Sequence, residues 1–147
     1  MANRLQLDRF LPYRLSLASN RVSDRIAGAY QALFGLSIPE WRLVAVVAEA
    51  GPITPAALGE RTAMDKVTVS RAAAALTARH LLARQPHAQD RRSHLLDLTD
   101  TGRDLYARVA PEALKLERQL LSGFSADEVS AFAAMLRRLE EAALALK

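Results

Sequence analysis

Apolar side chains recur at three- and four-residue steps through the first part of the chain, which is the spacing of one buried face of an α-helix. The residues of this face are Leu7, Leu11, Leu15, Val22, Ile26, Tyr30 and Leu33. Pro12 disfavours helical geometry at the residue before it, so it marks either a kink or the start of the helix. Gly35 then breaks the pattern, and we expect a long first helix within about residues 5–34.

The next apolar run begins with a helix-capping signal. Ser37 is followed three residues later by Glu40, which fits a capping box in which each side chain hydrogen-bonds to the other residue's backbone amide. The run stops at Gly51, so a second helix is predicted from about Pro39 to Ala50.

Two further helices are predicted before residue 81. Thr54 and Asp65 are good N-cap residues, and they precede helical stretches over about residues 55–61 and 65–80. Pro55 suits the first position of a helix because its ring fixes the backbone angle. Two helices joined by a turn of three or four residues have the outline of a helix-turn-helix.

The 65–80 helix has two different faces. Its predicted core face consists of Val69, Ala72, Ala73 and Leu76. The opposite face carries Val67, Arg71, Ala74 and Ala78. The small alanines allow the backbone to approach another surface closely. Thr68 and Ser70 flank this face and supply hydroxyl groups, and Arg71 supplies a long, forked donor. A solvent-exposed helix that is rich in alanine would have the same pattern.

A predicted β-hairpin follows, and its tip is charged. Residues 87–99 read HAQDRRSHLLDLT, and short apolar runs lie on both sides of the charged part. Asp90, Arg91 and Arg92 fall at the tip, where a hairpin usually has glycine or asparagine. Such a tip is either a binding element or a solvated loop.

The C-terminal part predicts two more helices. Thr99 can cap the first of them, which Pro111 interrupts. Ser125 and Glu128 fit a second capping box before the last helix. That helix repeats apolar residues at alternating four- and three-residue steps, which is typical of a seam that packs against another helix. The seam consists of Phe132, Leu136, Leu139, Ala143 and Leu146.

The composition is that of one globular domain spanning residues 1–147, with 50% hydrophobic and 24% charged residues. The sequence contains no cysteine, which excludes disulfides, thiol catalysis and cysteine-rich zinc sites. No apolar run approaches the roughly 20 residues that span a bilayer, and the N-terminus lacks the layout of a signal peptide. We therefore expect a cytoplasmic protein without a membrane partner.

Recognisable catalytic and metal-binding motifs are missing from the sequence. It has no nucleophile elbow, phosphate-binding glycine loop or HExxH motif, so we expect neither an enzyme nor a bound cofactor. His80 is expected on the apolar side of the 65–80 helix near its C-terminus, and His87 and His94 are placed to pair across the hairpin. Histidines at these positions, without cysteine, supply too few ligands for a metal site.

The positive charge is concentrated in one window. Residues 61–92 contain seven basic and two acidic residues, a net charge of +5, whereas the rest of the chain carries −1. The basic residues are Arg61, Lys66, Arg71, Arg79, Arg84, Arg91 and Arg92. A local basic patch is the electrostatic signature of a nucleic-acid-binding surface, although a solvated charged face has the same composition.

With its predicted helices and hairpin in this order, the chain resembles the MarR family of transcriptional regulators. The resemblance is carried by MDKVTVSRAAAALTARHLLAR at 64–84, by DRRSHLLDLTDTGRDLY at 90–106, and by FLPYRL and FGLSIPEWRL nearer the start. Its most specific motif is Asp-x-Arg in the hairpin, followed by Leu-Thr-x-x-Gly. The family implies a mostly α fold with a small β-hairpin wing. A winged helix-turn-helix at about 37–99 would lie between dimerisation helices at about 5–34 and 100–146.

The resemblance also implies which residues contact DNA. Asp90 and Arg92 match the wing pair of the family, in which the arginine enters the minor groove and the aspartate holds its guanidinium in place. Arg91 is then a phosphate contact or a solvated residue. The matching recognition-helix positions, suited to phosphates or base edges, are Lys66, Thr68, Ser70 and Arg71.

Family members bind pseudo-palindromic operators as homodimers, and many release DNA when a small aromatic or anionic effector binds. The implied dimer interface includes Phe132, Leu136, Leu139 and Leu146. The segments that would line an effector pocket contribute Tyr13, Arg14, Trp41 and Arg42. Alternatively, the two aromatic residues fill the core and the two arginines are solvated.

The function predicted from the sequence is therefore a repressor that binds double-stranded operator DNA as a homodimer and is released by an effector. The alternative is a helical interaction module whose basic window binds RNA or an acidic protein.

Overall fold

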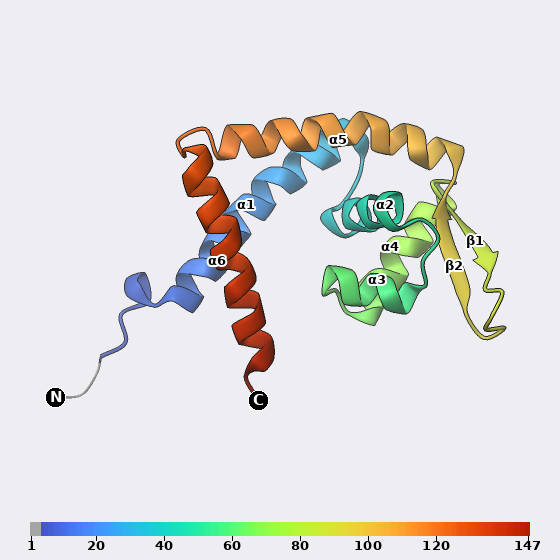
Figure 1. Cartoon of the computed structure of the whole chain (residues 1–147). Helices are drawn as coiled ribbons and strands as arrows, with labels where there is room; N and C mark the ends of the chain where they lie inside the picture. The colour runs from blue at the N-terminus through green and yellow to red at the C-terminus, as the bar shows by residue number, and fades with distance from the viewer. Residues whose placement is uncertain (1–3) are drawn as a thin grey trace. The chain divides into compact units, whose positions relative to one another are not determined.

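The computed structural model describes residues 4–147, which form six α-helices, a short 3-10 turn and one two-stranded antiparallel sheet (Figure 1). In chain order the elements are η1 (Leu7–Arg9), α1 (Leu11–Phe34), α2 (Ile38–Ala50), α3 (Pro55–Thr62), α4 (Lys66–Ala78), β1 (Leu82–Pro86), β2 (His94–Leu98), α5 (Asp100–Leu120) and α6 (Ala126–Ala145). The predicted fold class, mostly helical with a small β-hairpin, is confirmed. The chain divides into two compact units, one that ends at Val109 and one over Ala110–Lys147.

The first long helix begins and ends at the predicted proline and glycine. α1 starts at Leu11 and carries Pro12 in its first turn, so this proline marks the start of the helix and not a kink. At the other end Gly35 adopts the left-handed conformation, with φ 62°. Glycine has no Cβ and adopts this conformation at no steric cost, which explains why the helix stops there.

Side-chain caps start the next three helices, as predicted. In the capping box of α2, the Glu40 amide donates to the Ser37 hydroxyl at 3.3 Å, and the Ser37 amide donates to the Glu40 carboxylate at 2.9 Å. Thr54 caps α3 and Asp65 caps α4 through their side-chain oxygens. These bonds satisfy amides that have no partner within their own helix.

The core of the first unit lies among α2, α3, α4 and the sheet. Its most deeply buried side chains are Leu36, Leu43, Val44, Val47, Leu58, Leu76, Leu82, Leu96 and Val109. The predicted core face of α4 is buried, whereas Val67, Arg71, Ala74 and Ala78 on the other side are exposed. The division of α4 into two faces is therefore confirmed.

The prediction for the end of this helix was wrong by two residues. α4 stops at Ala78, and His80 lies outside the helix, exposed and in the left-handed conformation with φ 59°. The chain reverses there because the amide of Leu81 donates back to the carbonyl of Leu76 at 2.9 Å, a Schellman-type closure. His80 is therefore not on the apolar side of the helix.

The hairpin has a regular antiparallel register. Leu82 pairs with Leu98, Arg84 with Leu96, and Pro86 with His94. His94 therefore pairs with Pro86 and not with His87. Ile53 adds a short third pairing on the other edge of β2, exchanging backbone hydrogen bonds of 3.1 and 2.8 Å with Leu96. This bridge was not predicted, and it fixes the hairpin to the segment before α3.

The junction between β2 and α5 explains the Leu-Thr-x-x-Gly motif. The Thr99 hydroxyl accepts a hydrogen bond from the Gly102 amide at 3.0 Å and so caps α5, as predicted. It also donates to the carbonyl of His80 at 2.6 Å. A Cβ at position 102 would lie 2.2 Å from the carbonyl oxygen of Leu81, so only glycine fits at this contact.

The second unit contains the end of α5 and all of α6. α5 continues through Pro111, so the predicted interruption was wrong. An interior proline lacks the N–H of one backbone hydrogen bond and its ring crowds the carbonyl four residues earlier, but α5 continues to Leu120 in spite of both effects. The predicted capping box of Ser125 and Glu128 starts α6, with hydrogen bonds of 3.0 and 3.1 Å. The Glu128 carboxylate interacts with the backbone amide of Ser125 and, to a smaller extent, with its hydroxyl, and these interactions hold the pKa of Glu128 below its ordinary value.

Candidate nucleic-acid interface

The first turn of α4 is held by Asp65 and Thr68. The Asp65 carboxylate accepts from the Thr68 amide at 2.7 Å and from the Thr68 hydroxyl at 3.0 Å. These hydrogen bonds, the backbone one first, lower the pKa of Asp65 below its ordinary value. The Thr68 hydroxyl is thus oriented toward its own cap, and it can donate to a DNA phosphate only by leaving Asp65.

The outer face of α4 presents the other predicted recognition-helix residues to solvent. Lys66, Ser70 and Arg71 are exposed, and neither cation forms any of the ion pairs found in residues 4–147. Exposed alanines continue the same face toward the end of the helix, so no bulky side chain lies along it there. This combination of free donors and small residues permits close approach to a polyanion.

The wing tip is a tight turn made by Asp90. The Asp90 carboxylate accepts from the backbone amide of Arg92 at 3.0 Å, and the Asp90 carbonyl accepts from the amide of Ser93 at 3.2 Å. The expectation that Asp90 holds the Arg92 guanidinium is corrected, because no ion pair of Arg92 occurs in the described residues. An aspartate two residues before an amide closes an Asx turn, so it shapes the backbone instead. Arg91 and Arg92 are both exposed.

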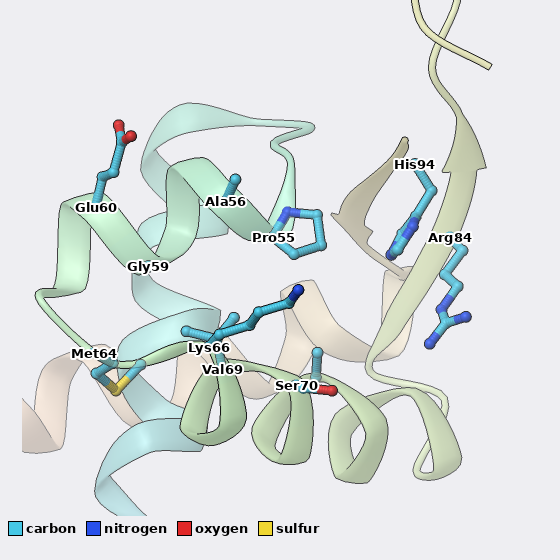
Figure 2. Close-up of a pocket in the computed structure, with 11 residues that line it drawn as sticks. Pro55, Ala56, Gly59, Glu60, Met64, Lys66, Val69, Ser70, Arg84 and His94 are labelled. Atoms are coloured by element: carbon cyan, nitrogen blue, oxygen red, sulfur yellow. The ribbon is translucent and has the colours of Figure 1, made fainter. Parts of the chain in front are cut away.

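A cavity of about 580 Å³ lies among α3, α4 and the hairpin. Figure 2 shows Lys66 and Ser70 on α4 and Arg84 and His94 on the two strands, whereas Glu60 on α3 points away from them. The floor of the cavity is apolar, with Gly59, Met64, Val69 and Ala73 among its lining residues. The cavity therefore has a polar rim toward the hairpin, and this rim is positively charged.

Arg84 and His94, which border this cavity, are not among the site residues predicted from the sequence. The alternation of side chains between the two faces of each strand identifies them, because side chains two residues apart share a face. The face that buries Leu82 and Leu96 at the base of the hairpin continues toward the tip with Arg84 and His94. Their side chains are therefore on the same side of the sheet as the core.

Two arginines of the basic window have structural partners. Arg61 lies 3.5 Å from the carboxylate of Glu49. The guanidinium of Arg79 donates to the backbone carbonyls of Gly35 and Phe34 at 3.0 and 3.2 Å. The other basic residues of this window are exposed and have no such partner among the described residues; they are Lys66, Arg71, Arg84, Arg91 and Arg92, all on α4 or the hairpin.

The structure does not bring the four predicted effector residues together within one chain. Trp41 lies in an aromatic cluster, with ring centroids 5.5 Å from Tyr30 and 5.9 Å from Tyr106. Tyr13 is 17 residues before Tyr30 on α1, which is about 25 Å along a helix axis. Tyr13, Arg14 and Arg42 are exposed. Trp41 is half-buried in this cluster, and the exposure of Arg14 and Arg42 agrees with the alternative in which the two arginines are solvated.

Three of the four predicted dimer residues lie on α6 and Leu146 is its C-cap, and no residue of that helix is buried in the single chain. Phe132 is 52% exposed and Leu139 is 50% exposed. Leu136 is half-buried and Leu146 is exposed. The seam is thus an apolar strip along one helix.

Residues 4–147 contain neither a metal-ligand cluster nor a membrane-spanning helix. No group of three or more histidine and carboxylate side chains lies close enough to hold a metal ion in this part of the chain. None of the helices described is both long and apolar enough to cross a membrane.

Comparisons with known proteins identify the family. A model described as the MarR family matches residues 34–93, which include the helix-turn-helix, β1 and the tip of the hairpin. The HTH-type transcriptional regulator PecS of Dickeya dadantii (strain 3937) is 31% identical over 131 residues, which is 87% of this chain and 76% of PecS.

Solved structures with the same fold extend over nearly the whole chain. A MarR/EmrR family transcriptional regulator from Acinetobacter sp. ADP1 superposes with a TM-score of 0.89 at 25% identity, covering 97% of this chain and 100% of that one. BpsR of Bordetella bronchiseptica, whose DNA binding is regulated by 6-hydroxynicotinic acid, has a TM-score of 0.74 at 25% identity, over 86% of this chain and 98% of its own. The chain belongs to the MarR family of transcriptional regulators, which are DNA-binding proteins and not enzymes.

Proposed function

We propose that this regulator is an operator-specific repressor that binds DNA as a homodimer and releases it when a small effector binds. The observation that carries the proposal is the set of exposed, unpaired cations on α4 and the hairpin, within residues 66–92. A protein of this kind acts on the chromosome, so we also propose that it works in the cytoplasm.

In the proposed complex, α4 enters the major groove and the wing tip enters the adjacent minor groove. Arg71 has the length and the forked donors to bond a guanine edge, and Ser70 is placed beside it for a phosphate or a base. Lys66 lies in the first turn of α4, where the helix dipole also favours a phosphate. Arg92 at the tip would read the narrow minor groove through its negative potential.

The apolar strip on α6 supports the proposed homodimer. Phe132, Leu139 and Leu146 together expose large apolar surfaces in the single chain, and a second copy would remove them from water. Next to this strip is an apolar groove of about 320 Å³ between the α5–α6 turn and the start of α6. A twofold dimer would present two recognition helices to half-sites about one helical turn apart.

The proposed effector is a small aromatic or anionic compound. The aromatic cluster of Tyr30, Trp41 and Tyr106 supports this chemistry, as does the exposed Arg42 that follows Trp41 in the sequence, and BpsR responds to such an acid. Tyr13 and Arg14 would join that site only from the partner subunit, because α1 holds them about 25 Å along its axis from Tyr30. A pocket shared by two subunits would couple effector binding to their arrangement.

A gel-shift titration tests the DNA-binding proposal. The probe is the promoter region next to the protein's own gene, and unrelated duplexes of the same length are the control. Specific binding with a steep salt dependence is expected, because neutralised phosphates release counterions. Equal affinity for unrelated duplexes, or a preference for RNA, would contradict the proposal. Small molecules released from the purified protein by denaturation, identified by mass, test the effector.

A further inference from the structure

Three consecutive residues after the recognition helix hold it to two other helices. We call residues 79–81 the α4 corner. Through these residues the end of α4 is bonded both to the end of α1 and to the start of α5. The corner lies wholly in the unit that ends at Val109.

Arg79 makes the connection to α1. Its guanidinium donates to the carbonyl oxygens of Phe34 and Gly35, 45 and 44 residues earlier in the chain. The last carbonyls of a helix have no partner within it and carry the negative end of the helix dipole, so they favour a cation. A planar guanidinium can reach two such carbonyls at once, which a single ammonium group does less well.

His80 and Leu81 make the connection to α5. The Thr99 hydroxyl donates to the His80 carbonyl at 2.6 Å, and the Thr99 amide donates to the Leu81 carbonyl at 3.1 Å. The missing side chain of Gly102 lets the first turn of α5 lie directly against Leu81. All of these contacts are made to the backbone carbonyls of His80 and Leu81, so they constrain the path of the main chain as well as its side chains.

We infer that Arg79 is a positioning residue for operator recognition, acting through the α4 corner. This inference rests on the proposed function, in which α1 and α5 belong to the helices that form the dimer. In a twofold dimer, the distance and angle between the two recognition helices depend on how each is held to those helices. Arg79 holds α4 to α1, and Thr99 holds α4 to α5.

Arg79 is not placed as a base-reading residue. It follows the C-terminal end of α4, about 20 Å along the axis from Lys66, and recognition helices read bases mainly with their N-terminal part. Its donors are also already engaged by two carbonyls. Its effect on DNA binding therefore passes through geometry.

The experiment measures how affinity depends on the spacing of the half-sites. The probes are duplexes that carry the footprinted operator with one or two base pairs inserted or deleted at its centre. The proteins are the parent, Arg79→Met, which keeps the length of the side chain, and Arg79→Lys, which keeps one cationic donor group. Arg61→Met is the control, because it removes the same charge from an exposed arginine whose partner is Glu49.

The parent is expected to prefer one spacing sharply. Arg79→Met is expected to bind the natural operator about tenfold more weakly, since both subunits lose two hydrogen bonds, and to lose much less affinity for the other spacings. The affinity of Arg79→Met for the operator should therefore depend less on the half-site spacing than the affinity of the parent does. Arg79→Lys should fall between, and Arg61→Met should keep the profile of the parent.

Two results would overturn the inference. One is an unchanged spacing profile in folded Arg79→Met, and the other is an equal loss on every duplex with a salt slope reduced by about one, which indicates a direct phosphate contact. If circular dichroism shows Arg79→Met to be unfolded, Thr99→Val tests the same corner from α5, with Thr99→Ser as its control. A parent that selects no operator at all would contradict the proposed function instead.

Discussion

The carboxylate of Asp90 accepts a hydrogen bond from the backbone amide of Arg92 at 3.0 Å, and this contact shapes the wing tip. The aspartate therefore acts on the backbone that carries the arginine, and the Arg92 guanidinium forms none of the ion pairs in the described residues. An asparagine can make the same turn with its amide oxygen, whereas alanine cannot.

The wing prediction compares three variants in the gel-shift titration. Arg92→Ala is expected to weaken operator binding strongly, by roughly 10- to 100-fold, because a charge in the minor groove is lost. Asp90→Ala should cause part of that loss, and Asp90→Asn should bind nearly as the parent does. A loss in Asp90→Asn as large as that in Asp90→Ala would show that the charge of Asp90 matters more than the turn.

Arg84 on β1 is predicted to contact the DNA backbone beside the recognition helix. If α4 lies in the major groove and the wing in the minor groove, the sugar-phosphate backbone between the two grooves must pass between α4 and the wing. Arg84 and Lys66 border the cavity at this place. Arg84→Gln should weaken binding to all duplexes alike and reduce the salt slope by about one. Arg61→Gln, which removes an equal charge away from the cavity, is the control. Parent-like salt dependence in Arg84→Gln would exclude this contact.

Leu139→Asp is predicted to dissociate the homodimer without unfolding the chain. Leu139 is 50% exposed in the single chain, so the new carboxylate is not buried until a second copy packs on α6. Burying an unpaired charge at that interface is costly. Sedimentation should therefore show a monomer, whereas Leu144→Asp, at a position that is 87% exposed and outside the predicted seam, should remain a dimer. A dimer of unchanged affinity in Leu139→Asp would place the interface elsewhere.

Gly102→Ala is predicted to lower the free energy of unfolding by about 2 kcal/mol or more, because its Cβ would overlap the Leu81 carbonyl. Backbone cannot move aside as a flexible side chain does, so the α4 corner and the first turn of α5 would have to separate. Gly28→Ala is a suitable control, since this glycine lies inside α1 with nothing within 4 Å of the added Cβ. It should raise stability by about 0.5–1 kcal/mol. Urea unfolding measures both changes, and a neutral Gly102→Ala would contradict the close approach.

The N-cap of α4 should contribute to the pH dependence of stability. Hydrogen bonds from Thr68 lower the pKa of Asp65 in the folded chain, so the ionised cap stabilises the fold above the pKa of the unfolded state. That contribution is lost as the pH falls through the lower pKa of the folded state. Asp65→Asn keeps an acceptor but does not titrate, so its deficit relative to the parent should be largest at neutral pH and should shrink in acid. A deficit that is the same at about pH 3 and pH 7 would contradict this assignment.

The sequence by itself determined the parts of this protein that depend on neighbours three or four residues away. The caps at Ser37, Thr54, Asp65 and Ser125 could be predicted because each bonds within its own first turn. The two faces of α4 follow from helical periodicity, and the family could be named from the residues of α4 and the hairpin.

Only the tertiary structure decided the contacts between distant segments. Arg79 is one of seven basic residues in its window, and its partners Phe34 and Gly35 become visible only when the end of α1 meets the end of α4. Likewise Ile53 pairs with Leu96, and Trp41 lies between Tyr30 and Tyr106. Periodicity tells which face of a segment is buried but not which other segment covers it, because that choice depends on how all the faces pack together at once.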